Sequence, residues 1–443
     1  MFARFFEFDK YQTNMTTEVR AGITTFLTLA YIIVVNPSIL EAAGIPRGPS
    51  TVATIIAAMV GTFLMGVYAK RPIAVAPYMG ENAFIAFTVC GLLGASWQTA
   101  LGAVFIGGVI FVIITAIRLR GWLANAVPTN LKYSFVVGIG LFLAFIGLTN
   151  SGLIVKGTGT PVAMGNLGSP SVLLTIVTLV LMVSLMIYKV RGAILYSILG
   201  MTIVGMILKV AGIDVAGVII PEKIVSLPTG LSEIAMKLDI FGALKLGFIP
   251  VLLTVFLMDF VDTIGTLIGV SDRAGFLDED GNLPEIEKPM MADAVATVVG
   301  ALAGTSTTGA YIESATGVEE GGRTGMTALV VTALFGLALF FTPLFSAVPT
   351  FAVSPALIIV GILMIGSIRK IDFEDLTELF PAFMTIVLMI FSYNLGIGIT
   401  AGFVLYPLIK IIAGRGKEVN AGAWILFGIS IVFYILHTLA LTG

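Results

Sequence analysis

Long apolar stretches without any charged residue dominate this chain, and several are as long as a membrane-spanning helix. A spanning helix needs about 20 apolar residues. The stretches are 21–40, 48–69, 82–117, 133–155, 157–188, 192–208, 294–312, 324–368, 379–409 and 419–443. A further apolar stretch, about 246–270, is interrupted by two aspartates. The pattern predicts an all-α polytopic membrane protein.

Three of these stretches are too long for one helix. We expect divisions near Gly94–Gln98, Ala347–Thr350 and Tyr393–Gly398. The chain then has fourteen spans, or fifteen with a terminal span near 422–441.

The composition agrees with a surface that faces lipid. Only 11% of the residues are charged, whereas soluble domains carry about 25%. The net charge of −2 predicts no nucleic-acid partner. One cysteine, Cys90, and one histidine, His437, exclude a disulfide framework and cysteine- or histidine-rich metal sites. We expect His437 to be structural or interfacial.

Lysine and arginine residues indicate the orientation, because they favour the cytoplasmic side of a membrane. If the N-terminus is cytoplasmic and the spans alternate, 18 of the 24 basic residues lie inside. Residues 1–20 are charged and lack the apolar core of a signal peptide. We therefore expect a multi-pass plasma-membrane protein with a cytoplasmic N-terminus.

Matching segments occur in the two halves of the chain. ATIIAAMVG at 53–61 aligns without a gap with ADAVATVVG at 292–300. A segment that is poor as a helix follows each copy, at 71–80 and at 304–311. Unwound backbone survives in a membrane only where it lines a cavity or pairs with a partner. Two interrupted spans in corresponding places indicate the central site of a transporter built from inverted repeats.

Carboxylates inside the apolar stretch 246–270 are the first candidates for chemistry. A carboxylate within a membrane costs several kcal/mol unless it is paired or wetted. We expect Asp262 to bind substrate or a proton, with Thr266, one turn further, beside it. Asp259 is a candidate for the same role or for a structural hydrogen bond to a neighbouring helix.

Each interrupted segment ends at a carboxylate that begins a new helix, Glu81 or Glu313. Helix N-termini present partial positive charge to a ligand. We expect Glu313 to bind substrate, and Asn82, which is both donor and acceptor, to suit the edge of a heterocycle. Glu81 is a candidate for proton coupling or for a bond to the facing segment.

Aromatic residues near these positions are candidates for packing on the face of a ring, with lipid or core packing as the alternative. They are Phe84, Phe260 and Tyr311. We find no phosphate-binding loop and no catalytic triad pattern, so we expect neither an enzyme nor a cofactor, and uphill transport would have to be driven by an ion.

Four segments resemble one family in order along nearly the whole chain. They are AGITTFLTLAYIIVVNPSIL (21–40), APYMGENAFIAF (76–87), FVDTIGTLIGV (260–270) and GTSTTGAYIESATGVEEGGRTG (304–325). Together they resemble the AzgA-like purine permeases, the adenine, guanine and hypoxanthine branch of the nucleobase–cation symporter superfamily, which also contains the xanthine and uracil permeases.

The resemblance implies the uracil-permease fold, with two inverted repeats of seven spans and short antiparallel strands in spans 3 and 10. It implies that Asp262, Glu313 and Asn82 bind the base, and that Thr266 and Ser314 line the same site. The chain departs from the family at Tyr78, usually a glycine, and at Glu81, usually a leucine, which leaves the preferred purine open.

The resemblance also implies a division into domains. They are a lead-in (1–20), core spans 1–4 (21–120), gate spans 5–7 (121–210), an extracytoplasmic connector (211–245), core spans 8–11 (246–345), and gate spans 12–14 with a further terminal span (346–443).

The sequence thus predicts a secondary transporter that imports purine bases with protons by an elevator-like movement of the core against the gate. The alternative is a transporter of another nucleobase, such as uracil or xanthine, or of a related small solute. The expected partners are the base and the lipid bilayer, and a homodimer is expected from the resemblance alone.

Overall fold

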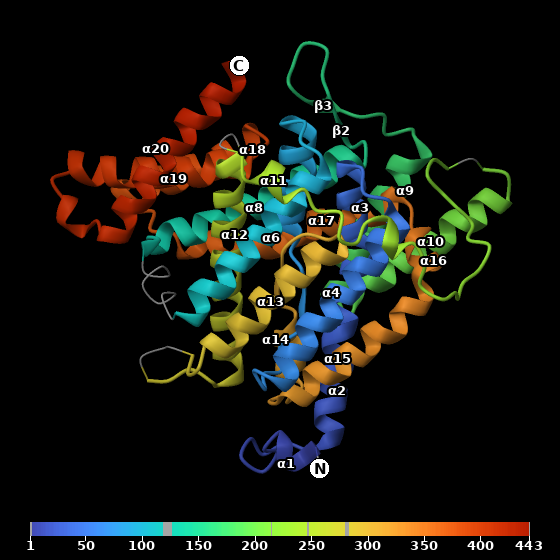
Figure 1. Ribbon diagram of the computed structural model, residues 1–443. Coiled ribbons are helices and arrows are strands. Elements are labelled where there is room, and N and C mark those ends of the chain that lie inside the picture. The colour runs from blue at the N-terminus through green and yellow to red at the C-terminus, as the bar shows by residue number, and fades with distance from the viewer. Residues whose placement is uncertain (1, 118–125, 214, 246–247, 280–282, 443) are drawn as a thin grey trace.

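A computed structural model of the protein describes residues 2–117, 126–213, 215–245, 248–279 and 283–442, and this part is mostly helical (Figure 1). Side chains are described as far as residue 435, except at position 250. The expectation for His437 therefore lies outside the described side chains.

The first half of the chain contains a short helix, the predicted spans and three short strands. Its elements are α1 (Phe2–Phe5), α2 (Met15–Leu29), α3 (Ile32–Leu40), η1 (Glu41–Ala43), α4 (Arg47–Val67), β1 (Val75–Pro77), α5 (Met79–Ala83), the π-helix η2 (Phe84–Leu92), α6 (Trp97–Ala116), α8 (Thr129–Asn150), β2 (Ile154–Val155), β3 (Ala163–Met164), α9 (Pro170–Ile187) and α10 (Ala193–Val210).

The second half follows a mixed connector and ends in a long helix. Its elements are η3 (Leu231–Glu233), α11 (Ile240–Ala243), α12 (Ile249–Ala274), α13 (Glu287–Ala303), β4 (Thr308–Ala310), α14 (Ser314–Glu319), α15 (Gly325–Ala338), η5 (Leu339–Phe341), α16 (Thr342–Ser346), α17 (Thr350–Ile365), η6 (Gly366–Lys370), α18 (Leu376–Phe391), α19 (Leu395–Ile412), η7 (Gly416–Glu418) and α20 (Ala421–Thr442).

Ten helical segments in the described ranges are long and apolar enough to cross a membrane. Three further apolar helical segments are shorter over their described side chains: α5 with η2, α18, and α20 as far as Ile435. Together with α13 and the unit β4–α14, these elements account for the fourteen expected spans, and α20 is an additional helix. The predicted fold class, an all-α polytopic membrane protein, is confirmed.

The expected divisions of the long apolar stretches are also found. η2 ends at Leu92 and α6 begins at Trp97, while α16 ends at Ser346 and α17 begins at Thr350. α18 and α19 are separated by residues 392–394. The stretch 157–188 differs, because α9 begins only at Pro170 and β2 and β3 form a hairpin before it. Glycine, threonine and proline dominate 157–169 and disfavour a helix there.

Strands β1 and β4 come from the two interrupted spans, one in each half of the chain, and they pair antiparallel. Val75 lies opposite Ala310, Ala76 opposite Gly309, and Pro77 opposite Thr308. The short strands expected in spans 3 and 10 are thus present, and each pairs with the other. The pairing satisfies backbone groups that lipid cannot satisfy.

Several helix–helix contacts have a counterpart in which every helix is replaced by its equivalent from the other half of the chain. Helix α4 packs on α15 as α13 packs on α6, and α8 packs on α18 as α17 packs on α9. Helix α2 likewise packs on α15 as α12 packs on α6. Helices of both halves therefore interleave, and Figure 1 shows α4 beside α13 and α15. This exchange is the packing that two inverted repeats produce.

Most contacts fall within two sets of helices. One set comprises α2 to α6 with α12 to α16, and the other comprises α8 to α10 with α17 to α19. Contacts across the sets include α5 with α8, α3 with α17, and α12 with α19. We name the first set of helices the core set and the second the gate set. Movement of one set against the other stays a prediction.

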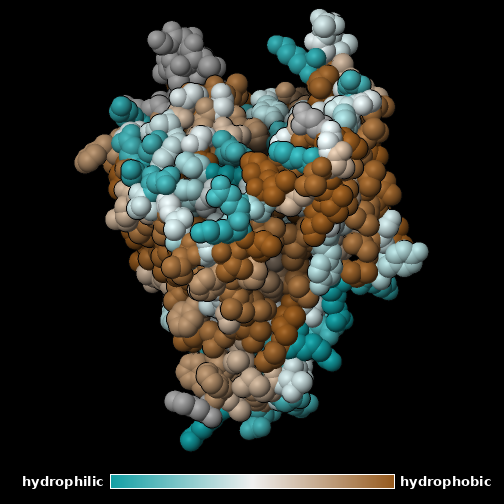
Figure 2. All heavy atoms as spheres, turned by 90° about the vertical axis from the view of Figure 1, so that its right-hand side faces the viewer, coloured by the Kyte–Doolittle hydropathy of each residue, from teal (hydrophilic) through white to brown (hydrophobic). Residues whose placement is uncertain are grey.

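Apolar side chains cover much of the outer surface. On α9, Val177 and Val180 are 52% and 59% exposed, and on α10 Ile207 is 60% exposed. Figure 2 shows apolar residues over most of one face, with hydrophilic residues gathered toward its two ends. Exposing such an apolar surface to water would cost free energy, whereas contact with lipid tails does not. This apolar band is therefore the surface that faces the bilayer.

Candidate substrate site

A threonine from the preceding helix supports each strand of the broken spans. Thr62 Oγ1 donates to Val75 O and accepts from Val75 N, both at 3.0 Å. Thr297 Oγ1 donates to Thr308 O at 2.8 Å and accepts from Thr308 N at 3.1 Å. Val75 and Thr308 are each the first residue of a strand. Both halves thus use the same device to satisfy unwound backbone in an apolar surrounding.

The tyrosine that follows each strand donates a hydrogen bond to the carbonyl of the last residue of the opposite strand. Tyr311 Oη donates to Pro77 O at 2.5 Å, and Tyr78 Oη donates to Ala310 O at 3.1 Å. The two rings stack with centroids 6.1 Å apart. Tyr311, expected as a candidate for packing on a substrate ring, therefore packs on Tyr78 and holds the strand junction.

Asp259 and Asp293 lie behind this junction and tie α12 to α13. Thr297 Oγ1, which donates to Thr308 O, also lies 3.5 Å from Asp259 Oδ2, and Thr263 Oγ1 donates to Asp293 Oδ2. Asp259 is 2% exposed and Asp293 is fully buried. The burial of Asp259 against Thr297 fits its structural interpretation as a contact with a neighbouring helix.

Asp262 follows three residues after Asp259 on α12 and is only partly buried, as is Thr266 one turn further. Tyr78 Oη lies 3.4 Å from the hydroxyl of Thr263, which is next to Asp262. Helix α12 contacts β4, α5 and α14. The partly open Asp262 is thus carried by the helix that contacts both broken spans.

Glu313 stands at the start of α14 and is held from α2–α3. Tyr31 Oη donates to Glu313 Oε1 at 2.6 Å, which leaves the second carboxylate oxygen to other partners. Ser314 is fully buried, and its Oγ accepts from Ala74 N at 3.0 Å. The Ser314 hydroxyl therefore serves the backbone beside β1, and its expected place in the substrate site stays a prediction.

Asn82 is fully buried on α5 and is oriented by a second asparagine. Asn82 Nδ2 donates to Asn36 Oδ1, and Asn36 Nδ2 donates to Thr54 Oγ1 at 2.6 Å and to Thr305 Oγ1 at 2.9 Å. Because Asn36 takes the donor end of Asn82, the acceptor Oδ1 of Asn82 is left with no partner among the described residues.

Further polar groups near the strand pair have spare hydrogen-bonding capacity. In the described part of the chain, the buried hydroxyls of Ser306, Thr307 and Thr308 and both carboxylate oxygens of Glu81 have no hydrogen-bond partner. Most buried polar groups in proteins are satisfied. A concentration of unsatisfied groups at one junction is therefore a sign of ligand or water binding there.

The two phenylalanines expected as candidates for ring packing are both in the protein interior. Phe260 is 1% exposed, and its ring lies 6.1 Å from the rings of Phe256 and Phe111. Phe84 is 2% exposed within the main apolar cluster. These contacts fit the alternative of core packing.

Several residues of this region were not singled out from the sequence. Tyr31, Asn36, Thr62 and Thr297 each supply a hydrogen bond that fixes the junction. Asn36 carried a usable signal, because an amide inside the apolar run VVNPSIL needs a buried partner. The threonines carried none, since threonine is common in membrane helices.

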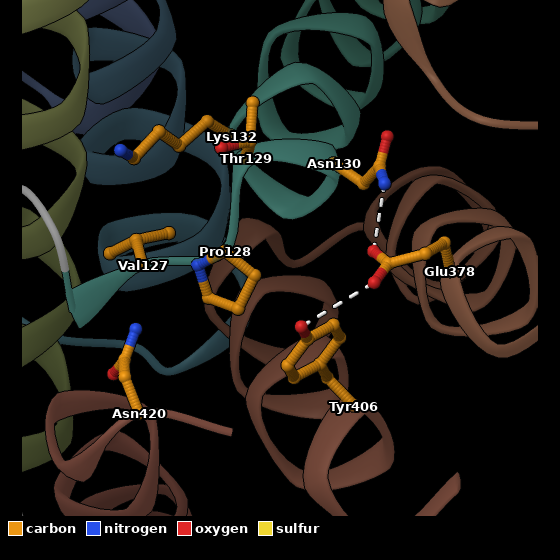
Figure 3. A pocket seen from close by; sticks show the side chains of 8 residues that line it. All are labelled: Val127, Pro128, Thr129, Asn130, Lys132, Glu378, Tyr406 and Asn420. Carbon is orange, nitrogen blue, oxygen red and sulfur yellow. Dashed lines mark hydrogen bonds between the residues drawn. The ribbon is translucent and has the colours of Figure 1, made fainter. Parts of the chain in front are cut away.

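A polar pocket of about 290 Å³ lies elsewhere, at the start of α8 (Figure 3). Asn130 Nδ2 donates to Glu378 Oε2 at 2.7 Å, and Tyr406 Oη lies 3.4 Å from Glu378 Oε1. The other lining residues are Val127, Pro128, Thr129, Lys132 and Asn420. None of the predicted site residues lines this pocket.

A charged cluster beside the pocket ties α18, α19 and η7 together. Lys410 is fully buried and lies 2.7 Å from Glu378 and 2.9 Å from Glu418. Arg415 Nη1 lies 2.5 Å from Asp375 Oδ2. Hydrogen bonds from Thr377 and Arg415 hold the pKa of Asp375 at about 2, and those from Arg415 and Lys410 hold the pKa of Glu418 at about 2.

An ionic contact connects the gate set to the core set. Arg191, between α9 and α10, forms a salt bridge with Glu320, which follows α14. Arg20 of α2 lies 3.2 Å from the same carboxylate. Glu320 thus holds two arginines from different sets.

Within the described ranges, no group of three or more His, Cys, Asp or Glu residues is arranged to hold a metal ion. The polar junction instead offers hydrogen-bond acceptors and hydroxyls, which suit a small neutral ligand that carries N–H groups.

The fold and the broken-span junction define a multi-pass membrane transporter, and comparison with known proteins assigns its family. Residues 16–405 match the xanthine/uracil permease family, described as a permease family. The chain belongs to this family, as the resemblance of its motifs predicted.

Its relatives align along almost the full chain. The putative permease MJ0326 of Methanocaldococcus jannaschii is 46% identical, covering 97% of this chain and 96% of the relative. The adenine permease AdeP of Escherichia coli (strain K12) is 40% identical, covering 99% and 97%. The guanine/hypoxanthine permease PbuO of Bacillus subtilis (strain 168) is 41% identical, covering 97% and 99%.

Solved structures support the fold. The transmembrane domain of the cyanobacterial bicarbonate transporter BicA aligns with a TM-score of 0.66 at 15% identity, covering 88% of this chain and 97% of that domain. At this identity the likeness shows the architecture alone, and it agrees with the inverted-repeat packing described above.

Proposed function

We propose that this chain imports purine nucleobases of the adenine, guanine and hypoxanthine class across the plasma membrane together with protons. Relatives with about the same length are adenine and guanine/hypoxanthine permeases at 40% and 41% identity. The observation that carries the proposal is made at the junction of the broken spans. Buried acceptor groups without a hydrogen-bond partner in the described structure lie there.

In the proposed binding mode, Asp262 and Glu313 accept hydrogen bonds from N–H groups of the base. Such bonds to ionised acceptors are about twice as strong as neutral ones. The free Oδ1 of Asn82 and the hydroxyls of Ser306, Thr307 and Thr308 complete the edge of the ring. Tyr31 keeps the Glu313 carboxylate in place.

In the proposed transport cycle, the core set carries the site past the gate set, and the N-terminus lies in the cytoplasm. The Arg191–Glu320 salt bridge joins the two sets in the present conformation and would break as the core moves. Alternating access in such folds is largely a rigid movement of one unit against another around a fixed site.

Uptake by the purified full-length protein in proteoliposomes tests the proposal. Radiolabelled adenine, guanine, hypoxanthine, xanthine and uracil are offered with and without an inside-alkaline pH gradient. We expect a purine to be taken up and the gradient to increase its uptake. Preference for uracil or xanthine would support the other nucleobase transporters, and independence from the gradient would refute proton coupling.

Two substitutions test the site itself. Asp262→Asn and Glu313→Gln keep side-chain size but remove the ionised acceptor, so we expect each to weaken base binding at least about tenfold. Glu319→Gln is the matched control, because Glu319 is exposed and pairs with Arg273 at 2.6 Å. Unchanged binding in both site variants would refute the assignment of these carboxylates.

A further inference from the structure

Glu81 is a buried carboxylate that the binding mode above does not use. It is fully buried in the first turn of α5, and neither carboxylate oxygen has a hydrogen-bond partner in the described ranges. Glu18 is equally buried, but its oxygens accept from Thr13 and Thr327, among others. An ionised carboxylate buried without partners is costly, so Glu81 is suited to hold a proton.

Helix α5, which carries Glu81, is in contact with α12. A Cβ at the preceding residue, Gly80, would lie 3.8 Å from Met258 Cε on α12. Asp262 is one turn beyond Met258 and shares its helix face. On α12, Asp259 and Asp262 follow Met258 by one and four residues, and Asp293 of α13 is joined to α12 through Thr263.

No positive charge faces Glu81 from the other packed elements, as far as the described residues show. α3 has no titratable side chain, and η2 has only Cys90, more than two turns away. Lys132 and Tyr133 of α8 lie about two turns before Ile139, the α8 residue against Gly80.

The remaining titratable neighbours are two phenols that are neutral near pH 7. They are Tyr78 and Tyr311, whose hydroxyls bond backbone carbonyls. Arg273, the basic residue of α12, lies about three turns beyond Asp262 and pairs with Glu319. Among the described residues of these elements, Glu81 therefore faces carboxylates and neutral groups. Carboxylates that share a buried site do not all ionise, and one of them keeps a proton.

We propose that Glu81 carries the coupling proton, which it shares with Asp262. In the empty site the proton resides on either carboxyl group of the pair. When a base arrives, Asp262 must be ionised to accept its N–H group. The O–H bond of Asp262 breaks, an O–H bond forms on Glu81, and the base and the proton cross the membrane together.

This inference rests on the proposed function and makes a separate prediction about coupling. Glu81→Gln and Glu81→Met both remove the proton carrier, and the second also replaces the buried carboxyl group with an apolar side chain. Asp262 can still accept from the base in both. We therefore expect these variants to bind and exchange the base but to lose accumulation driven by protons.

The test compares counterflow exchange with accumulation in proteoliposomes of the full-length protein, with the membrane potential clamped. For one proton per base, the wild type should concentrate the base about tenfold per pH unit of gradient. Both Glu81 variants should equilibrate the base without concentrating it, and counterflow should stay within about threefold of the wild type. Glu319→Gln, on the exposed surface, should accumulate as the wild type does.

Accumulation by Glu81→Gln or Glu81→Met equal to the wild type would overturn the proposal. If a variant also loses counterflow, its base binding is measured in detergent between about pH 5.5 and 8.5. A pH dependence of binding equal to that of the wild type would refute the proton role of Glu81. A flattened pH dependence would support it. If the wild type itself binds and exchanges none of the purines, the proposed function fails instead.

Discussion

Tyr78 lies over Gly309 so closely that a methyl group on Gly309 would lie 2.0 Å from Tyr78 Cε2. The tyrosine belongs to the first half of the chain and the glycine to β4 in the second half. Two contacts hold the Tyr78 side chain: its ring stacks on Tyr311, and its hydroxyl donates a hydrogen bond to Ala310 O. The two broken spans therefore meet where a side chain of one half fills the space left by a glycine of the other.

Gly309→Ala should consequently destabilise the protein by roughly 1–3 kcal/mol, as overpacking in tight cores does. Thermal unfolding of the detergent-solubilised variant measures the effect. Gly200→Ala on α10 is the control, since a Cβ there meets no atom within 4 Å, and it should leave the midpoint unchanged or raise it. Equal midpoints for Gly309→Ala and the wild type would contradict the packing described here.

Tyr311→Phe removes the donor to Pro77 O and leaves a buried carbonyl without this bond. We expect a loss of about 1–3 kcal/mol in the free energy of unfolding. Tyr188→Phe is a matched control, because Tyr188 is 80% exposed and the same substitution should cost little there. If Tyr311→Phe and Tyr188→Phe unfolded at the same temperature, the hydrogen bond from Tyr311 to Pro77 O would not stabilise the junction.

Tyr31→Phe should weaken base binding through Glu313, since it removes the hydroxyl that orients this carboxylate. A hydrogen bond to a charged group contributes about 1.5–3 kcal/mol, so we expect at least about tenfold weaker binding, with a smaller change in unfolding temperature. Calorimetric titration with the preferred purine measures the affinity. Tyr196→Phe, on exposed α10 surface, serves as the control.

Linking Arg191 to Glu320 tests whether the core set moves against the gate set. With Cys90 replaced by serine, Arg191→Cys and Glu320→Cys joined by a short reducible bifunctional reagent should abolish uptake, and reductant should restore it. The salt bridge places the two side chains next to one another in the present conformation. Full uptake by the linked protein would exclude a relative movement at this contact.

Arg415→Gln should lower stability at neutral pH because Arg415 pairs with Asp375 and Glu418. Both carboxylates have pKa values lowered to about 2 from the ordinary 3.8 and 4.5. Their contribution is therefore fully present above about pH 4.5 and is lost as the pH falls toward 2. The difference in unfolding temperature between wild type and variant should shrink over that window.

The control for this pH dependence is Lys417→Gln, which removes a nearby exposed positive charge. Its unfolding temperature should follow that of the wild type at every pH. A difference for Arg415→Gln that stays constant from pH 7 to pH 3 would contradict the assignment of the shifted pKa values to these ion pairs.

The apolar pattern was sufficient to predict the helices that cross the membrane and most of the places where they end, although α9 begins only at Pro170. Lipid offers no hydrogen bonds, so most spans are long uncharged helical runs that can be read from the chain alone. The divisions at 93–96 and 347–349 followed from the same length rule. The interrupted segments and the carboxylates after them were also visible, because proline, glycine and charge are conspicuous inside apolar sequence.

Local sequence also indicated that the two halves correspond, from the alignment of 53–61 with 292–300. It could not supply the register of β1 on β4, which depends on how four helices from both halves pack around the strands. The sequence pattern therefore gave the existence of both breaks but not the contacts between them.

The roles of individual polar residues were decided by the tertiary structure alone. Asp259 and Asp262 are three residues apart on one helix, yet Asp259 is buried within 3.5 Å of the Thr297 hydroxyl while Asp262 stays partly open. The donor end of Asn82 is held by Asn36, and Glu81 beside it has unsatisfied oxygens in the described structure. Spacing along one helix fixes the direction of a side chain, but its partners come from helices far away in the chain, and only packing brings them together.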